Sequence, residues 1–189
     1  GFNQKRPFKL LYAGAHGEAN DLSNIINAAK ILGDYPIKFV FVGNGPEKQK
    51  LVEESKCLTN VIFRDPVSKS EMPSLISKFD AIIVSLKNIP LFSYGVSPNK
   101  LYDAYAVGRP VITTIRGDVN KEVEINKLGF TSPPEDHYAL ADSLKKMLLS
   151  SREERERMGK RAREIAERIY SRERINKQFN ELISYIILK

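Results

Sequence analysis

The sequence predicts an α/β fold: a Rossmann-like open parallel sheet with helices on both faces, followed by a C-terminal helical tail. Short apolar runs typical of strands alternate with segments of helical periodicity, and the connections between them are short. The run Ile37–Val42 is nearly all apolar, as expected of a strand whose sheet is covered on both faces. Ligands bind to such sheets at the carboxyl ends of the strands, so the loops that follow the strands are the place to search for a site.

The first part of the chain alternates strand and helix candidates. Phe8–Gly14 is a β-like run ending in a glycine turn. The helix after it has Asn20 or Asp21 as N-cap, and its apolar positions follow helical spacing through Leu32. Further strands are expected at Ile37–Val42, Asn60–Arg64 and Asp80–Leu86, with helices from Pro46 to about Lys56 and from Ser70 to about Lys78.

The second part begins with a capped helix and the strand 110–115, and a short strand is expected near 129–131. Three helices follow at about 136–149, 152–168 and 172–187. Apolar faces are predicted for the last two, formed by Met158, Ala162, Ile165 and Ile169 and by Ile175, Phe179, Leu182 and Ile186. Since no repeat or low-complexity linker interrupts the chain, residues 1–189 are expected to form a single domain.

Composition favours a globular protein of a reducing compartment. Apolar residues make up 42% and charged residues 28% of the chain. No apolar run approaches the roughly 18 residues that span a bilayer, and the first residues lack the apolar core of a signal peptide, so a cytoplasmic location is expected. The chain starts at Gly1 rather than Met, which suggests a processed or excised piece. Cys57 is the single cysteine and His16 and His137 the only histidines, which argues against a disulfide or a zinc site.

The net charge of +7 is compatible with nucleic acid, an anionic membrane surface or anionic small molecules. Much of the charge lies in Arg152–Arg174, where Arg and Lys alternate with Glu. That mixture is typical of a solvated helix face. Basic and aromatic residues are not interleaved as in single-strand binders, so no nucleic-acid partner is expected.

Residues 92–113 read as a loop, a sharply starting helix and a strand. Ser97 is a suitable N-cap and Pro98 suits the first helical position. The free N–H groups of Asn99, Lys100 and Leu101, the helix dipole and the Lys100 charge would together bind an anion.

Asp103, one turn into this helix, is placed to accept hydrogen bonds from a diol. Leu101, Ala104 and Ala106 are expected to pack inward, and Gly108 to end the helix. A phosphate-binding helix start with a carboxylate one turn in suits a nucleotide diphosphate. An ordinary capped helix of an α/β sheet has the same features, and on capping alone that interpretation is the commoner one.

Two other loops carry weaker signals. Gly14–Glu18 contains glycines that let the backbone approach a phosphate or sugar, but its spacing is neither a dinucleotide fingerprint nor a P-loop. Asp65–Lys69 can offer backbone groups and a flat apolar contact to a base. Taken alone, each is better explained as a turn between a strand and a helix.

The order of these parts resembles the C-terminal, donor-binding half of family 4 GT-B glycosyltransferases. It is most similar to the branch that transfers N-acetylated deoxyhexosamines in O-antigen or capsule synthesis. The similarity extends over residues 8–187 and is carried, after the first strand and its glycine loop, by the segments 41–51, 60–73, 80–86, 97–112 and 155–164.

The resemblance implies a nucleotide-sugar site. Diphosphate and sugar would lie near Gly14, His16, Gly17 and Glu18, and the base at Pro66 and Val67. The helix start of Ser97, Pro98, Asn99 and Lys100 would hold the diphosphate, and Asp103 the ribose hydroxyls. Lys100 and His16 are the catalytic candidates, and no metal or other cofactor is expected.

The sequence departs from the family pattern at three places. Where the family usually has two glutamates eight residues apart, this chain has Gly95 and Asp103, so one carboxylate is missing and the other is shortened. The usual Arg and Lys after the first strand are also absent, and Lys100 is the candidate replacement charge.

GT-B enzymes have two Rossmann-like halves, and 189 residues accommodate only one. The resemblance therefore implies the donor half of a retaining, metal-independent glycosyltransferase for cell-surface polysaccharide, with a donor that is UDP-linked in this branch. The acceptor, a saccharide or lipid-linked saccharide, would be bound by the absent N-terminal half, at or near the inner face of the membrane. The alternatives are half of a GT-B-fold sugar-nucleotide 2-epimerase and a non-catalytic nucleotide-binding module whose basic face docks on a membrane or partner.

Overall fold

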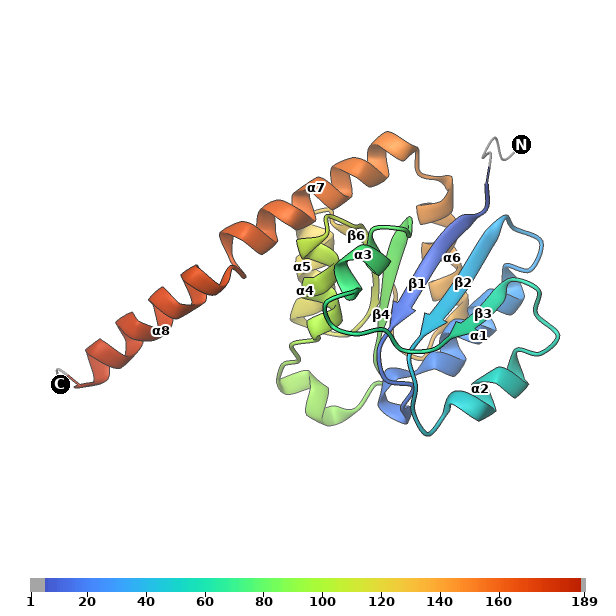
Figure 1. Cartoon of the computed structure of the whole chain (residues 1–189), viewed down its shortest axis with the longest axis horizontal. Helices are drawn as coiled ribbons and strands as arrows, with labels where there is room; N and C mark the ends of the chain where they lie inside the picture. Colours follow the sequence, from blue (N-terminus) through green and yellow to red (C-terminus); the bar gives the residue numbers. More distant parts are fainter. Residues whose placement is uncertain (1–5, 188–189) are drawn as a thin grey trace.

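The computed structural model describes residues 6–187 and contains a six-stranded parallel sheet in the order β3-β2-β1-β4-β5-β6 (Figure 1). The strands are β1 (Phe8–Ala13), β2 (Ile37–Val42), β3 (Val61–Arg64), β4 (Ala81–Ser85), β5 (Val111–Thr114) and β6 (Gly129–Thr131). Each strand is parallel to its neighbours. The predicted fold class is confirmed, including the short strand at 129–131.

Helices cover both faces of the sheet (Figure 1). Side chains of α1 (Leu22–Ile31), α2 (Lys48–Glu54) and α6 (His137–Leu149) share one core cluster with alternate residues of β1 and β2. The opposite cluster takes its helical members from α3 (Met72–Ile76), α4 (Asn99–Ala106), α5 (Asp118–Ile125) and α7 (Arg152–Arg168). Helix α5 and the 3-10 turns η1 (Glu18–Asn20) and η2 (Pro90–Tyr94) were not predicted.

Helix α4 starts one residue later than expected. Pro98 occupies the N-cap position, and the hydroxyl of Ser97 donates to the hydroxyl of Tyr102 at 3.2 Å instead of capping the helix. The predicted capping role of Ser97 is therefore wrong. The helix ends as predicted, with Gly108 at φ +69° just beyond it.

The inward face of α4 is also partly different from the prediction. Leu101 and Ala104 are buried, but Ala106 is exposed and Tyr105 is fully buried in its place. The reason is helical spacing, because positions three and four residues after Leu101 share its face and position five does not.

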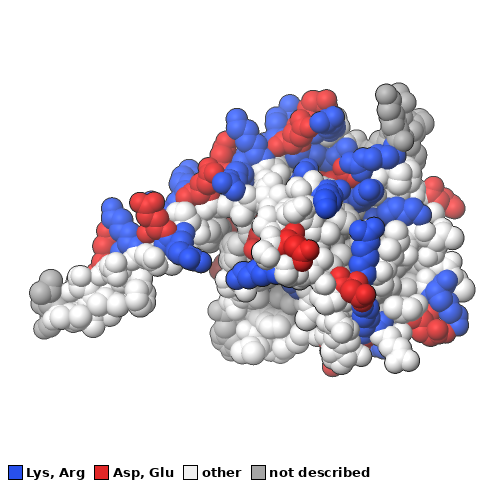
Figure 2. All heavy atoms as spheres, viewed as in Figure 1, with Lys and Arg blue, Asp and Glu red and all other residues white. Residues whose placement is uncertain are grey.

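Helix α7 crosses the C-terminal end of α4 at two glycines. A Cβ on Gly159 would lie 2.1 Å from the carbonyl oxygen of Gly108, so the two backbones touch. Ala162 and Ile165 are buried on the predicted face, whereas Ile169 is 39% exposed and was wrongly included. Alternating basic and acidic side chains cover the outer surface of α7, as expected of a solvated helix face (Figure 2).

Helix α8 (Arg172–Ile187) extends away from the body of the domain and has no buried residue (Figure 1). The apolar residues predicted to share a face are all exposed, for example Phe179 at 60% and Ile186 at 63%. In the view of Figure 2, the far part of this helix carries no charged side chains before the undescribed terminus. None of the helices between residues 6 and 187 has the length and apolarity needed to cross a membrane.

Because α8 buries nothing, we expect that ending the chain after Tyr170 leaves the free energy of unfolding unchanged to within about 0.5 kcal/mol. The measurement is urea denaturation followed by circular dichroism. Ile165→Ala is the matched control, because emptying this buried position in α7 should destabilise the domain by about 2–5 kcal/mol. A loss above about 1 kcal/mol on truncation would mean that α8 packs on the domain in solution.

Candidate functional site

The loops that follow β1 and β2 meet backbone to backbone at the carboxyl edge of the sheet. The N–H of Gly14 donates to Val42 at 2.9 Å, and the N–H of His16 donates to Asn44 at 2.8 Å. A Cβ on Gly43 would lie 1.9 Å from the carbonyl oxygen of Gly14, so no side chain fits there. These contacts fix the Gly14–Glu18 loop as a rigid floor at this edge.

The loop after β4 joins this edge through Lys87. Its N–H donates to the carbonyl of Ala19 at 3.0 Å, and its ammonium pairs with Glu18 at 2.8 Å. The hydrogen bond from Lys87 lowers the pKa of Glu18, which therefore stays ionised. Glu18 is at the predicted edge, but its carboxylate already has a cationic partner.

Lys100 reaches from the first turn of α4 to the β1–α1 loop. Its ammonium donates to the side-chain oxygen of Asn20 at 2.7 Å and to the hydroxyl of Tyr12 at 3.1 Å. The Tyr12 hydroxyl donates its own proton to the carbonyl of Ala15 at 2.7 Å, which leaves its oxygen free to accept from Lys100. The ammonium also lies 4.7 Å from the centre of the Tyr12 ring, a cation–π distance.

All of these partners are neutral. No carboxylate of the described residues forms an ion pair with Lys100. Burial lowers the pKa of Lys100 to about 8, and burial also raises the pKa of Tyr12, which stays a neutral phenol. A half-buried cation without a counter-ion is suited to receive an anion.

The start of α4 adds backbone donors beside this cation. The N–H of Leu101, expected to be free, donates to the carbonyl of Pro98 at 2.9 Å, so that part of the prediction is wrong. Asn99 and Lys100 are left as the N–H donors of the first turn without a described backbone acceptor. They face outward with the positive end of the helix dipole.

Asp103 lies one turn further along α4, as predicted, and is exposed. Partial burial raises the pKa of Asp103, and the charge of Lys69 in the β3–α3 loop acts in the opposite direction. In that same loop Pro66 is exposed and Val67 packs partly against the core cluster that contains Leu101. The residues predicted for ribose and base therefore belong to neighbouring elements of one edge.

His16 is enclosed rather than presented to the edge. Its side chain is fully buried, with edge-on ring contacts to Phe41 and Phe63 at 6.4 and 5.8 Å between ring centres. Burial, Lys48 and Lys100 all lower the pKa of His16, so the imidazole is neutral. Neither ring nitrogen has a hydrogen-bond partner in the described structure. Its catalytic assignment stays a prediction, and its observed role is to pack the loop against β2 and β3.

Two glycines at this edge have open surroundings. A Cβ on Gly95 would meet no atom within 4 Å, but Gly95 lies at φ +122°. That is a conformation that residues with side chains rarely adopt. Gly17 has only Asn20 nearby, and with Glu18 it borders a hollow of about 420 Å³.

Sequence reasoning missed Tyr12 and Asn20 as parts of the site. Tyr12 reads as an ordinary strand residue and Asn20 as an N-cap, and nothing in their spacing indicates contact with Lys100, 80 or more positions away. As for metals, no group of three or more His, Cys, Asp or Glu side chains between residues 6 and 187 could hold an ion. Metal independence stays a prediction.

Replacing Asn20 by Asp places a carboxylate where Lys100 now has a neutral acceptor. We expect Asn20→Asp to raise the pKa of Lys100 by about 1–2 units, because an adjacent opposite charge favours the ammonium. The pKa is measured by NMR titration of the lysine ε-methylene group. Asn27→Asp, in α1 beside exposed Lys30, is the control and should leave the Lys100 titration unchanged. An unchanged Lys100 pKa in Asn20→Asp would contradict the contact.

The chain is similar to a known protein family and to two curated relatives. The family model described as glycosyl transferases group 1 matches residues 2–165. The colanic acid biosynthesis glycosyl transferase WcaI of Escherichia coli K12 is 31% identical over 179 residues, which is 90% of this chain and 41% of WcaI. WcaL of the same organism is 26% identical over 183 residues, or 94% of this chain and 45% of WcaL. The chain thus spans less than half the length of these relatives.

Solved structures share the fold. Anabaena HepE in complex with UDP superposes with a TM-score of 0.82 at 18% identity, over 95% of this chain and 49% of HepE. The C-terminal domain of the group 1 glycosyl transferase LpcC from Francisella tularensis has a TM-score of 0.71 at 22% identity, with 89% of each chain covered.

Proposed function

The chain belongs to the glycosyl transferases group 1 family, and from this premise we propose that it is the donor-binding half of a retaining glycosyltransferase. The observation that carries the proposal is the Lys100 ammonium, half-buried among neutral acceptors beside the free N–H groups of α4. Such a site favours a diphosphate. The donor is a UDP-sugar in this proposal, which is supported by the UDP bound to HepE.

In the proposed mechanism, Lys100 and the helix start act on the leaving group. Negative charge grows on the departing diphosphate as the glycosidic bond breaks, and fixed donors at that position stabilise it without reorganisation. One such donor contributes about 10²–10³ in rate in comparable preorganised sites. Asp103 binds the ribose hydroxyls, and Pro66 and Val67 hold the base.

The acceptor is bound by another part of the enzyme in this proposal. The curated relatives are more than twice as long as this chain, so a second half of similar size is available to them. The name of WcaI supports a role in polysaccharide synthesis. This chain alone would bind donor and not turn it over.

Titration calorimetry with UDP in the absence of added metal tests the proposal. We expect wild-type chain to bind UDP, and Lys100→Met to weaken binding by about 10–100-fold, because a charge-assisted hydrogen bond to phosphate contributes about 1.5–3 kcal/mol. Lys160→Met, an exposed position on α7, is the matched control and should bind like wild type. Equal binding by Lys100→Met and Lys160→Met would refute the assigned role of Lys100, and absence of UDP binding by the wild type would count against the donor.

The pH dependence of UDP binding follows from the pKa of Lys100, about 8 in the free protein. Only the protonated form attracts the diphosphate, so affinity should be constant well below pH 8 and fall above it, approaching about tenfold per pH unit. In Lys100→Met, which has no ammonium to lose, UDP affinity should show no such decline between about pH 7.5 and 9.5. A wild-type profile that is flat across this range would contradict the assignment.

A further inference from the structure

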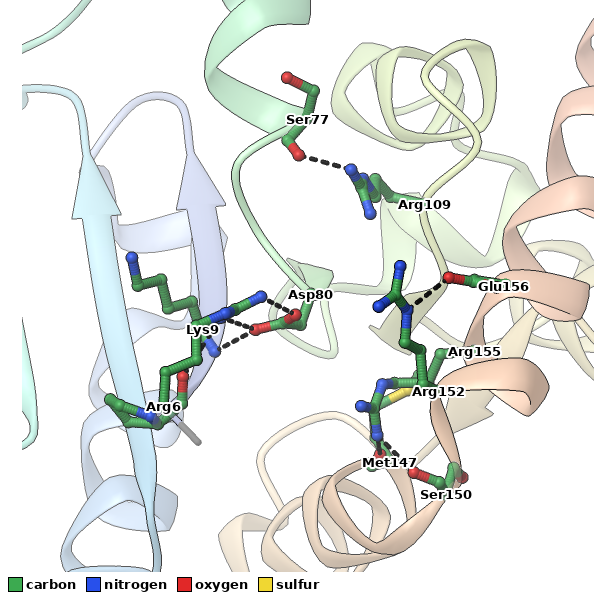
Figure 3. A network of polar contacts seen from close by, with 11 residues as sticks. Arg6, Lys9, Ser77, Asp80, Arg109, Met147, Ser150, Arg152, Arg155 and Glu156 are labelled. Carbon is green, nitrogen blue, oxygen red and sulfur yellow. Dashed lines mark hydrogen bonds and ion pairs between the residues drawn. The ribbon is translucent and has the colours of Figure 1, made fainter. Parts of the chain in front are cut away.

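A basic hollow lies at the opposite edge of the sheet from the candidate donor site. It has a volume of about 550 Å³ and lies where the chain enters β1, β4 and β5, against the start of α7. Figure 3 shows side chains from these separate segments, with Arg6 directed toward Asp80, Arg109 toward Ser77 and Arg152 toward Glu156. The basic residues that line the hollow are Arg6, Lys78, Arg109, Arg152 and Arg155.

The two acidic side chains of the hollow are already neutralised. Asp80 accepts two hydrogen bonds from the guanidinium of Arg6, at 2.7 and 2.8 Å, and a third from the N–H of Lys9 at 2.8 Å (Figure 3). Glu156 pairs with Arg152 at 2.7 Å. Each acid is thus matched by one arginine, and the other cations of the lining are left over.

Arg109, Arg155 and Lys78 have no acidic partner among residues 6–187. Arg109 donates to the carbonyl of Ser77, and its Nε is buried without a hydrogen-bond acceptor. Arg155 donates to the carbonyls at the end of α6, that of Ser150 and, at 3.4 Å, that of Met147. Carbonyl oxygens satisfy donors but do not neutralise charge, so the hollow keeps an excess of positive charge.

Arg155 is a partly buried cation of this lining. Burial lowers the pKa of Arg155, while the charges of Asp80, Glu153 and Glu154 act in the opposite direction and that of Arg6 adds to the effect of burial. A bound anion would compensate for the water that this guanidinium has lost. Guanidinium groups are well suited to phosphate oxygens, which they bind through paired N–H donors.

The lining favours a small soluble ligand over a membrane surface. Its large apolar side chain, Phe79, is only 4% exposed, and Pro110 is also buried, so neither can insert into a bilayer. The volume lies in the range of small-molecule sites. We propose that this hollow binds a soluble phosphorylated ligand with two or more negative charges, at a site separate from the donor site. The inference does not depend on the proposed glycosyl transfer.

Pyrophosphate is the probe, titrated by calorimetry into the Lys100→Met variant so that the candidate donor site is impaired. We expect binding to persist in this background and to weaken by at least about tenfold when Lys78→Gln and Arg152→Gln are added, because an unpaired cation is lost and the carboxylate of Glu156 is left without its partner to repel the anion. These exposed residues are chosen because Arg109 and Arg155 also hold backbone carbonyls in place. The matched control adds Arg168→Gln and Arg172→Gln, exposed positions outside the hollow, and should bind as the background does.

Three results would overturn the proposal. If the Lys100→Met variant, without further substitutions, fails to bind pyrophosphate, then all pyrophosphate binding takes place at the donor site. If the variant with Lys78→Gln and Arg152→Gln, here called the pocket variant, binds pyrophosphate as well as its control does, then pyrophosphate binds outside the hollow. In a parallel sedimentation assay, binding to vesicles of anionic phospholipid that is lost in the pocket variant, without pyrophosphate binding, would make the hollow a membrane contact. Failure of UDP binding would leave all three readouts unaffected, so the two proposals are tested separately.

Discussion

The ammonium of Lys100 constrains the whole carboxyl edge of the sheet. A cation that is partly removed from water needs hydrogen-bond acceptors, and the chain supplies them from β1 and from the turn after it rather than from a carboxylate. The acceptors are held in place because the loops after β1 and β2 touch through their backbones at Gly14 and Gly43. The position of the Lys100 ammonium therefore depends on the strand order, on the two glycines and on the path of α4. No carboxylate of the described residues neutralises its charge.

Cationic side chains have different partners at the two edges of the sheet. At the carboxyl edge, one half-buried lysine contacts neutral oxygens and lies beside two backbone N–H groups without a described backbone acceptor. At the amino edge, several guanidinium groups surround acids that are already paired. Helix dipoles explain part of the first arrangement but not the second, which arises because the chain segments before β1, β4 and β5 and the start of α7 converge on one hollow.

Local pattern was enough to predict every strand, β6 included, and every α-helix except α5, because most elements carry their own periodicity or turn residues. Local pattern failed where tertiary contacts determine the partner of a side chain. Ser97 has the residue type of an N-cap, yet its hydroxyl bonds Tyr102 instead. Lys100 was identified from its place at a helix start, whereas its partners Tyr12 and Asn20 were not, since nothing local links residues so far apart. His16 looked available in the sequence because burial by Phe41 and Phe63 is visible only in three dimensions.

Gly95 carries a consequence for how this loop can change over evolutionary time. The resemblance to family 4 enzymes places a glutamate at this position, and there is ample room for one. The backbone at φ +122°, however, belongs to a region almost exclusive to glycine, where another residue costs about 1–3 kcal/mol. A glutamate at position 95 would therefore carry this backbone strain unless the loop between β4 and α4 took a different path. Glycine at this position and the present shape of the loop therefore depend on each other.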